Sequence, residues 1–217
     1  MSLPNSTSTG TFSPVLVKAA EHIGRNEFAR AEALLRPFVA DNPTDVNGIR
    51  LLGELGVAVG ALQDGQNLLE RVIELAPDYQ RARFALANVL YKRHSYDEAL
   101  GQLQQLLATA PDNVSWLLLK AASLVEVNGH SEAIAIFERV IALDPSLRQG
   151  HLSYGHALRA VGRSSEAIAA YERCIELGDG VGEAYWSLAN LKTYRFDERQ
   201  IEAIEHRLQD PACAFRD

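Results

Sequence analysis

The chain of 217 residues is 47% hydrophobic and 23% charged, a composition typical of a soluble protein with one elongated domain or two small ones. Its formal net charge of -7 argues against nucleic acid and anionic membranes as partners, because like charges would meet. The two cysteines, Cys174 and Cys213, have no motif spacing and form no disulfide framework, so we expect a reducing compartment, the cytoplasm.

The chain begins with a segment, residues 1–11, that we expect to be a flexible leader. It opens the stretch MSLPNSTSTGTFSP, which lacks the positive charge and the apolar core of a secretory signal. The longest mostly apolar stretch, WLLLKAASLVEV at residues 116–127, contains Lys120 and Glu126 and is too short to span a bilayer. These features predict a soluble protein without a membrane partner.

A repeat of 34 residues organises the chain after this leader, and it predicts a repeated packing unit. Prolines recur at this interval after apolar helical patterns, at Pro43, Pro77, Pro111 and Pro145. Small residues recur at the same interval in two columns. The first column is Ala31, Gly65, Ala99, Ala133 and Ala167. The second column is Ala19, Gly53, Ala87, Ala121, Gly155 and Ala189.

The two columns predict pairs of antiparallel helices, because helices approach closely only where the side chains at their crossing are small. Proline would end the second helix of each pair, since it lacks an N–H group and disfavours helical geometry at the preceding residue. Glycine, asparagine and serine in turns such as NGHSEA and GRSSEA would make the tight turn and cap the helix that follows.

This repeat resembles the tetratricopeptide repeat (TPR) family. The stretch RARFALANVLYKRHSYDEALGQLQQLLATAPDN, residues 81–113, carries the family pattern nearly intact, with Leu86 and Ala87 at its Leu-Gly pair and Tyr96 at a later signature position. The first unit is degenerate, and no unit has tryptophan at the family's early tryptophan position. The resemblance implies an all-α, right-handed superhelical solenoid of antiparallel helix pairs. Its array would cover residues 12–196, with about five repeats and a sixth, partial one.

In TPR stacks the first helix of each repeat lines a concave groove, which implies a surface for a protein or peptide partner. Aromatic and arginine side chains are favoured anchors in such recognition, although a merely solvated helix face is the alternative. The full Lys/Asn set with which some family members grip a terminal carboxylate is not present. The predicted groove residues are Asn47, Arg50, Glu54, Arg81, Phe84, Asn88, Tyr91, Leu118, Gln149, Leu152, His156, Arg159, Trp186 and Asn190.

The stretch AYWSLANLKTYRF, residues 184–196, carries four aromatic residues and begins as the first helix of a sixth unit. It resembles the junction in bacterial fusion proteins in which a TPR array precedes a sulfotransferase domain. The aromatic run would then be a seam for another domain, or else the core of the terminal repeat. Residues 197–217 are expected to form a capping helix and tail, with Ile201, Ile204 and Leu208 at helical spacing.

No pattern predicts a catalytic, metal or cofactor site, so we expect no enzyme activity from this chain. The six histidines have no metal spacing, and Cys174 stands at a core position of the repeat. Three functions remain open. The first is a scaffold that binds a protein or peptide in its groove, and the second is the repeat region of a sulfotransferase, active only if a further domain exists. The third is a self-assembling array, which would make the chain a homo-oligomer.

Overall fold

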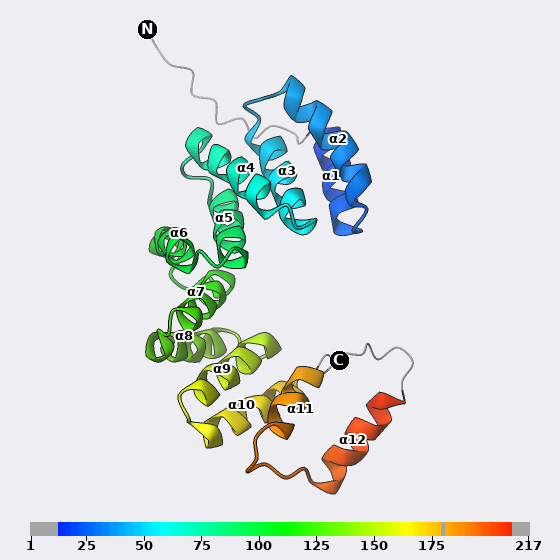
Figure 1. Ribbon diagram of the computed structural model, residues 1–217. Coiled ribbons are helices and arrows are strands. Elements are labelled where there is room, and N and C mark those ends of the chain that lie inside the picture. The colour runs from blue at the N-terminus through cyan, green and yellow to red at the C-terminus, as the bar shows by residue number, and fades with distance from the viewer. Residues whose placement is uncertain (1–12, 179–180, 210–217) are drawn as a thin grey trace. The chain divides into compact units, whose positions relative to one another are not determined.

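The computed structural model of the protein describes residues 13–178 and 181–209. These residues form helices without a strand in either range, which confirms the all-α fold of antiparallel helix pairs (Figure 1). The predicted leader, residues 1–11, lies outside the described residues, as does Cys213. The helices are α1 (Pro14–Gly24), α2 (Phe28–Asp41), α3 (Val46–Ala58), α4 (Leu62–Leu75), α5 (Gln80–Lys92), α6 (Tyr96–Thr109), α7 (Val114–Glu126), α8 (His130–Leu143), α9 (Arg148–Ala160), α10 (Ser164–Glu176), α11 (Gly182–Ala189) and α12 (Glu198–Leu208).

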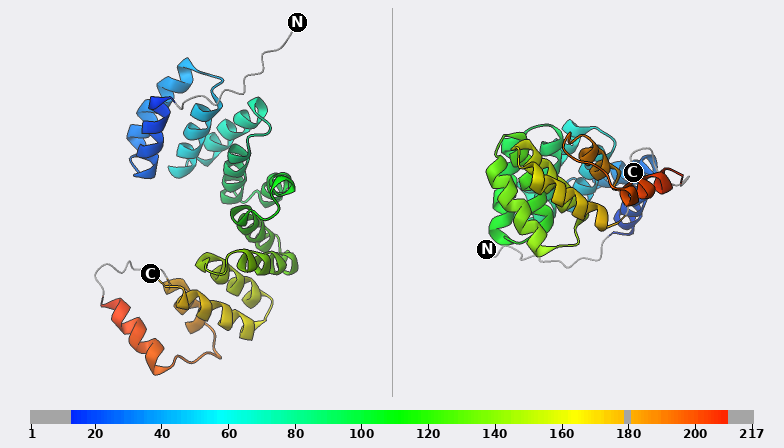
Figure 2. Two further views of the ribbon diagram at one scale, coloured as in Figure 1. Left: turned by 180° about the vertical axis from the view of Figure 1, so that it is seen from behind. Right: turned by 90° about the horizontal axis from the view of Figure 1, so that it is seen from below.

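The chain divides into two compact units, with the boundary inside α6 between Gln102 and Leu103. In unit 1, α1 packs on α2 and α3 packs on α4, and the first helices α1, α3 and α5 also contact one another in that order. In unit 2, α7 packs on α8, α9 packs on α10, and α10 contacts α11. Figure 2 shows α9 and α10 side by side from two directions.

Small residues lie where the helices of a pair cross, as predicted. Every member of the two columns except Ala189 is buried. A Cβ atom added to Gly65 on α4 would lie 2.9 Å from the carbonyl oxygen of Gly53 on α3, so this crossing has no room for a side chain. Ala189 is exposed, and the prediction is wrong there, because α11 ends at that residue and the chain continues to α12 without a helix across it.

The prolines end the second helices as predicted, because α2, α4, α6 and α8 each stop two residues before one. The caps differ from the prediction. The residues before α2, α4, α8 and α10 make no side-chain cap, whereas Asp45 and Asn113 cap the first helices α3 and α7. The Asp45 carboxylate accepts from the Gly48 N–H at 2.7 Å, which satisfies an amide that the helix itself leaves unpaired.

The turn inside each helix pair contains one residue in the left-handed backbone region, and this position also recurs every 34 residues. The residues are Asn26, Gly60, His94, Asn128 and Gly162, with φ between 58° and 85°. Glycine and asparagine adopt this conformation readily, but a histidine Cβ atom crowds the backbone there.

Replacing His94 with glycine is therefore expected to stabilise the fold by about 1 kcal/mol. Loss of the exposed contact between His94 Nδ1 and the Tyr96 hydroxyl, 2.5 Å, reduces this gain. Urea denaturation followed by circular dichroism measures the change. Asn128→Gly is the matched control and should change stability less, because asparagine already tolerates the left-handed region. A fall in stability for His94→Gly would show that the contact with Tyr96 outweighs the backbone conformation.

Candidate functional site

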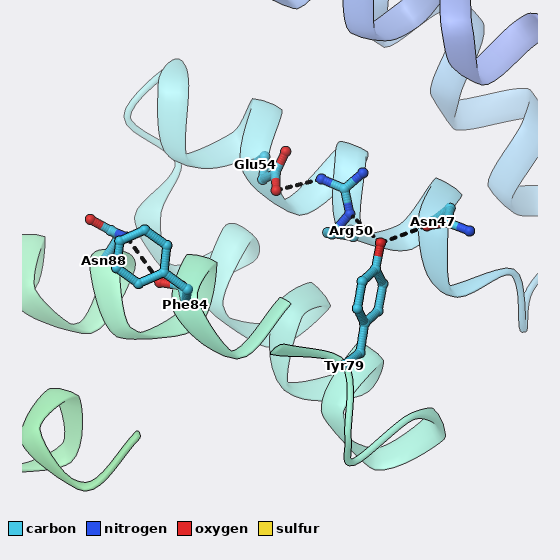
Figure 3. Close-up of polar contacts among 6 residues, drawn as sticks. All are labelled: Asn47, Arg50, Glu54, Tyr79, Phe84 and Asn88. Atoms are coloured by element: carbon cyan, nitrogen blue, oxygen red, sulfur yellow. Dashed lines mark hydrogen bonds and ion pairs between the residues drawn. The ribbon is translucent and has the colours of Figure 1, made fainter. Parts of the chain in front are cut away.

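An open pocket of about 260 Å³ lies between α3 and α5 in unit 1. Arg81, Phe84 and Asn88 follow one another at intervals of three and four residues, which places them on one side of α5. The Asn88 amide donates from Nδ2 to the Phe84 carbonyl oxygen at 2.9 Å, which holds this side chain beside the aromatic ring (Figure 3). We call this site the α3–α5 pocket, and its lining residues are Glu54, Val57, Arg81, Phe84, Ala85 and Asn88.

The α3–α5 pocket brings together four of the residues that the sequence predicts for a groove: Glu54, Arg81, Phe84 and Asn88. Val57 and Ala85 add apolar surface beside the Phe84 ring, so the polar groups stand around a mainly apolar floor. Tyr91, one turn beyond Asn88, packs edge-on against Tyr96 with 5.5 Å between ring centroids.

Arg50 is not the exposed groove residue that we predicted, because only 2% of it is exposed. Its Nε donates to the Tyr79 hydroxyl at 3.1 Å, and its Nη1 donates to Glu54 Oε1 at 2.5 Å. The Tyr79 hydroxyl in turn donates to Asn47 Oδ1 at 2.7 Å (Figure 3). Tyr79 precedes α5 without capping it, and its side chain reaches instead to two residues of α3. The repeat pattern did not predict that Tyr79 contacts Arg50, because Tyr79 lies in a turn.

A second pocket in unit 1, of about 440 Å³, lies between α1 and α3. Arg81 lines both pockets, so the two sites adjoin. Sequence reasoning missed the α1 side because the first repeat is degenerate, and only the structure shows that Val17 is exposed on α1. We call this site the α1–α3 pocket, and its lining residues are Leu16, Val17, Ala20, Glu21, Arg50, Leu51 and Arg81.

The predicted groove residues of α7 and α9 in unit 2 occupy mixed environments. Leu118 is half-buried, and Gln149 and Arg159 are exposed. Leu152 is buried with 6% exposure, so the prediction of an exposed position is wrong there. An aliphatic side chain gains free energy by leaving water, which favours this burial.

His156 connects α9 to α11 within unit 2. Its Nε2 lies 3.1 Å from Ser187 Oγ and 3.9 Å from Glu183 Oε1, and its ring packs against Tyr171 with 5.5 Å between centroids. Burial lowers the pKa of His156 below its usual value, although the nearby Glu183 carboxylate opposes this shift. The neutral ring is therefore favoured, and His156 serves as a packing contact between repeats rather than as a free charge.

The aromatic residues near the end of the described chain separate into two environments. Tyr185, Tyr194 and Phe196 pack together, with the Phe196 ring centroid 6.3 Å from that of Tyr185 and 5.1 Å from that of Tyr194. Trp186 is 63% exposed, beside exposed Asn190, whose Nδ2 donates to the Trp186 carbonyl oxygen at 2.8 Å. Three of the four aromatics thus form a half-buried cluster, and Trp186 presents its ring to solvent.

The helix α12 forms where the apolar spacing predicted it. Asp197 begins it with a capping box, in which its side chain accepts from the Gln200 N–H at 2.8 Å. Its apolar residues are poorly covered by the described chain, since Ile201 is 45% and Leu208 74% exposed. Its role as a cap over the solenoid stays a prediction.

No group of three or more histidine, cysteine, aspartate or glutamate side chains in residues 13–178 and 181–209 is placed to hold a metal ion. Over the same ranges, no helix combines the length and the apolar character needed to cross a bilayer. Cys174 is buried with 1% exposure, as its repeat position predicts, and burial raises the pKa of its thiol, which disfavours the reactive thiolate.

Family profiles of the tetratricopeptide repeat match residues 57–122 and residues 118–181. No curated protein matches the sequence. Among solved structures, "MamA AMB-1 P212121" is 25% identical with a TM-score of 0.67, and the alignment covers 76% of this chain and 98% of that one. The structure "MamA 41-end from Desulfovibrio magneticus RS-1" is 18% identical with a TM-score of 0.69, covering 77% of this chain and 97% of that one. These structures share the fold of this chain over most of its length.

Proposed function

Since residues 57–181 are tetratricopeptide repeats, we propose that the chain is a non-catalytic scaffold that binds an extended segment of a protein partner across the α3–α5 pocket. The observation that carries this proposal is the meeting of Glu54, Arg81, Phe84 and Asn88 around one open pocket. The pocket combines an aromatic anchor with polar groups at its rim, as binding hot spots do.

An extended segment suits this pocket because it can insert one side chain and because its backbone N–H and C=O groups are free to form hydrogen bonds. The apolar surface of Val57, Phe84 and Ala85 can bury a single apolar side chain. Asn88 uses one N–H to reach the Phe84 carbonyl, which leaves its Oδ1 and its other N–H for the partner's main chain. A folded surface has fewer free backbone groups to offer, so we favour an extended partner.

Selection from a displayed library of random 12-residue peptides tests this proposal on the full chain. Enriched peptides are expected to bind the Phe84→Ala variant at least about tenfold more weakly than the wild type, because an aromatic anchor is removed from a mainly apolar pocket. Fluorescence anisotropy with the synthesised peptides measures the affinity.

The matched control is Gln104→Ala, which truncates an exposed side chain on α6 outside both pockets. This variant should bind the peptides as the wild type does. If no peptide is enriched, or if enriched peptides bind Phe84→Ala as tightly as the wild type, the α3–α5 pocket is not the binding site.

A second candidate function is the repeat region of a sulfotransferase fusion protein. The exposed apolar residues Trp186, Ile201 and Leu208 favour it, because a neighbouring domain would cover them. Reading the gene beyond codon 217 tests this function. An α/β domain with a loop for a nucleotide sulfate would support it, and a stop codon would remove it.

A further inference from the structure

The α1–α3 pocket contains a buried guanidinium group with unused hydrogen-bond donors. Arg50 donates from Nε to Tyr79 and from Nη1 to Glu54, but its Nη2 has no acceptor among the described residues. Figure 3 shows this nitrogen pointing away from Glu54. Because Arg50 is 2% exposed and lines the pocket, the unused donors have access to little beyond the space inside it.

A guanidinium donor that has no acceptor in the protein can bind an acceptor supplied by a ligand, so this pocket is suited to such a ligand. A carboxylate is the best match for guanidinium donors, since it can accept two parallel N–H bonds. A second guanidinium, that of Arg81, lines the same pocket and makes no ion pair with the described residues. Two arginine side chains therefore face one space.

Acidic side chains in and beside the pocket nevertheless oppose the binding of a carboxylate. Arg50 is already paired with Glu54, and the exposed Arg81 lines the pocket together with Glu21 of α1. An incoming carboxylate would be attracted by both guanidinium groups and repelled by Glu21 and by Glu54, the partner of Arg50. Glu21 is therefore expected to weaken the binding of an acidic ligand, and replacing it with a neutral residue should raise the affinity.

The other lining residues of the pocket indicate which kind of side chain would bring the carboxylate. Leu16, Val17, Ala20 and Leu51 give the pocket an apolar side, which fits the methylene groups of a long acidic side chain. Because Arg81 also lines the α3–α5 pocket, a segment bound there would pass directly beside this site. We propose that the α1–α3 pocket binds the side chain of a glutamate in the partner segment, next to the apolar residue that fills the α3–α5 pocket. The inference rests on the proposed function.

The test uses the peptides enriched on the full chain. Each peptide is synthesised with its glutamate, with glutamine in its place, and with an amidated C-terminus. On the wild type, the glutamine peptide is expected to bind about tenfold more weakly, the loss expected for one charge-assisted interaction. On Arg81→Gln, the difference between the two peptides should shrink to about twofold or less, whereas Glu21→Gln should bind the glutamate peptide more tightly.

The control is Arg71→Gln, which removes an exposed arginine of α4 that lines neither pocket. It should keep the full preference for glutamate, which separates a specific site from the overall charge. Peptides that need Phe84 but bind equally well with glutamine would overturn this inference and leave the proposed function standing. Peptides that lose binding on amidation would assign the site to a chain end and overturn the side-chain assignment. A selection without enriched peptides would remove the proposed function and this inference together.

Discussion

Replacing Gly65 with alanine is expected to destabilise unit 1 by about 3 kcal/mol. The added Cβ atom would lie 2.7 Å from Val57 Cγ2 and 2.9 Å from the Gly53 carbonyl oxygen. The valine methyl group can rotate away, but the carbonyl belongs to the backbone of α3, so the two helices must separate. The free energy of unfolding, from urea denaturation followed by circular dichroism, measures the effect.

The control for this variant is Gly101→Ala on α6. Gly101 is exposed, and a Cβ atom there would meet nothing within 4 Å. Alanine favours the helix over glycine by about 1 kcal/mol, so this variant should be more stable than the wild type. If both variants gained stability, the α3–α4 crossing would not depend on the absence of a side chain at Gly65.

Replacing Arg50 with methionine is expected to destabilise unit 1 by about 2–3 kcal/mol. Methionine keeps most of the aliphatic volume, but it removes the charge beside Glu54 and the donor to the Tyr79 hydroxyl. The Glu54 side chain is only 28% exposed, so water replaces the lost partner incompletely.

The corresponding change at the surface is Arg36→Met. Arg36 and Glu32 also lie four residues apart, with Nε and Oε1 at 2.7 Å, but their side chains are 69% and 46% exposed. An exposed pair of this kind contributes little, so this variant should unfold close to the wild type. If urea denaturation gave equal decreases in the free energy of unfolding for Arg36→Met and Arg50→Met, the buried contacts of Arg50 would stabilise the protein no more than the exposed pair does.

The sequence predicts most of the fold because helix packing restricts which residues can stand at certain positions, and these positions recur at a fixed interval. A helix crossing such as Gly53 with Gly65 tolerates only small side chains, and the prolines that follow the second helices stop them, so both features recur every 34 residues. The prediction fails at Ala189, because α11 ends there and no second helix of a pair crosses it among residues 13–178 and 181–209. Periodicity identifies the repeating unit, but it does not reveal where the neighbours stop.

The candidate site is less predictable because a position in the repeat gives the side of a helix and not what covers that side. Phe84 and Asn88 lie in a pocket as their register indicates. Arg50 has an equivalent register, yet Tyr79 from a neighbouring turn joins it in a buried network. The α1–α3 pocket needs residues from a repeat too degenerate to align, so only the structure reveals that Arg81 is shared by two pockets.

A crystal structure of the full chain with one of the enriched peptides tests the central claim most directly. We expect density for an extended peptide with an apolar side chain against Phe84 and its main chain within hydrogen-bond distance of the Asn88 amide. Density for the peptide on the second helices, with the α3–α5 pocket left to solvent, would contradict this account.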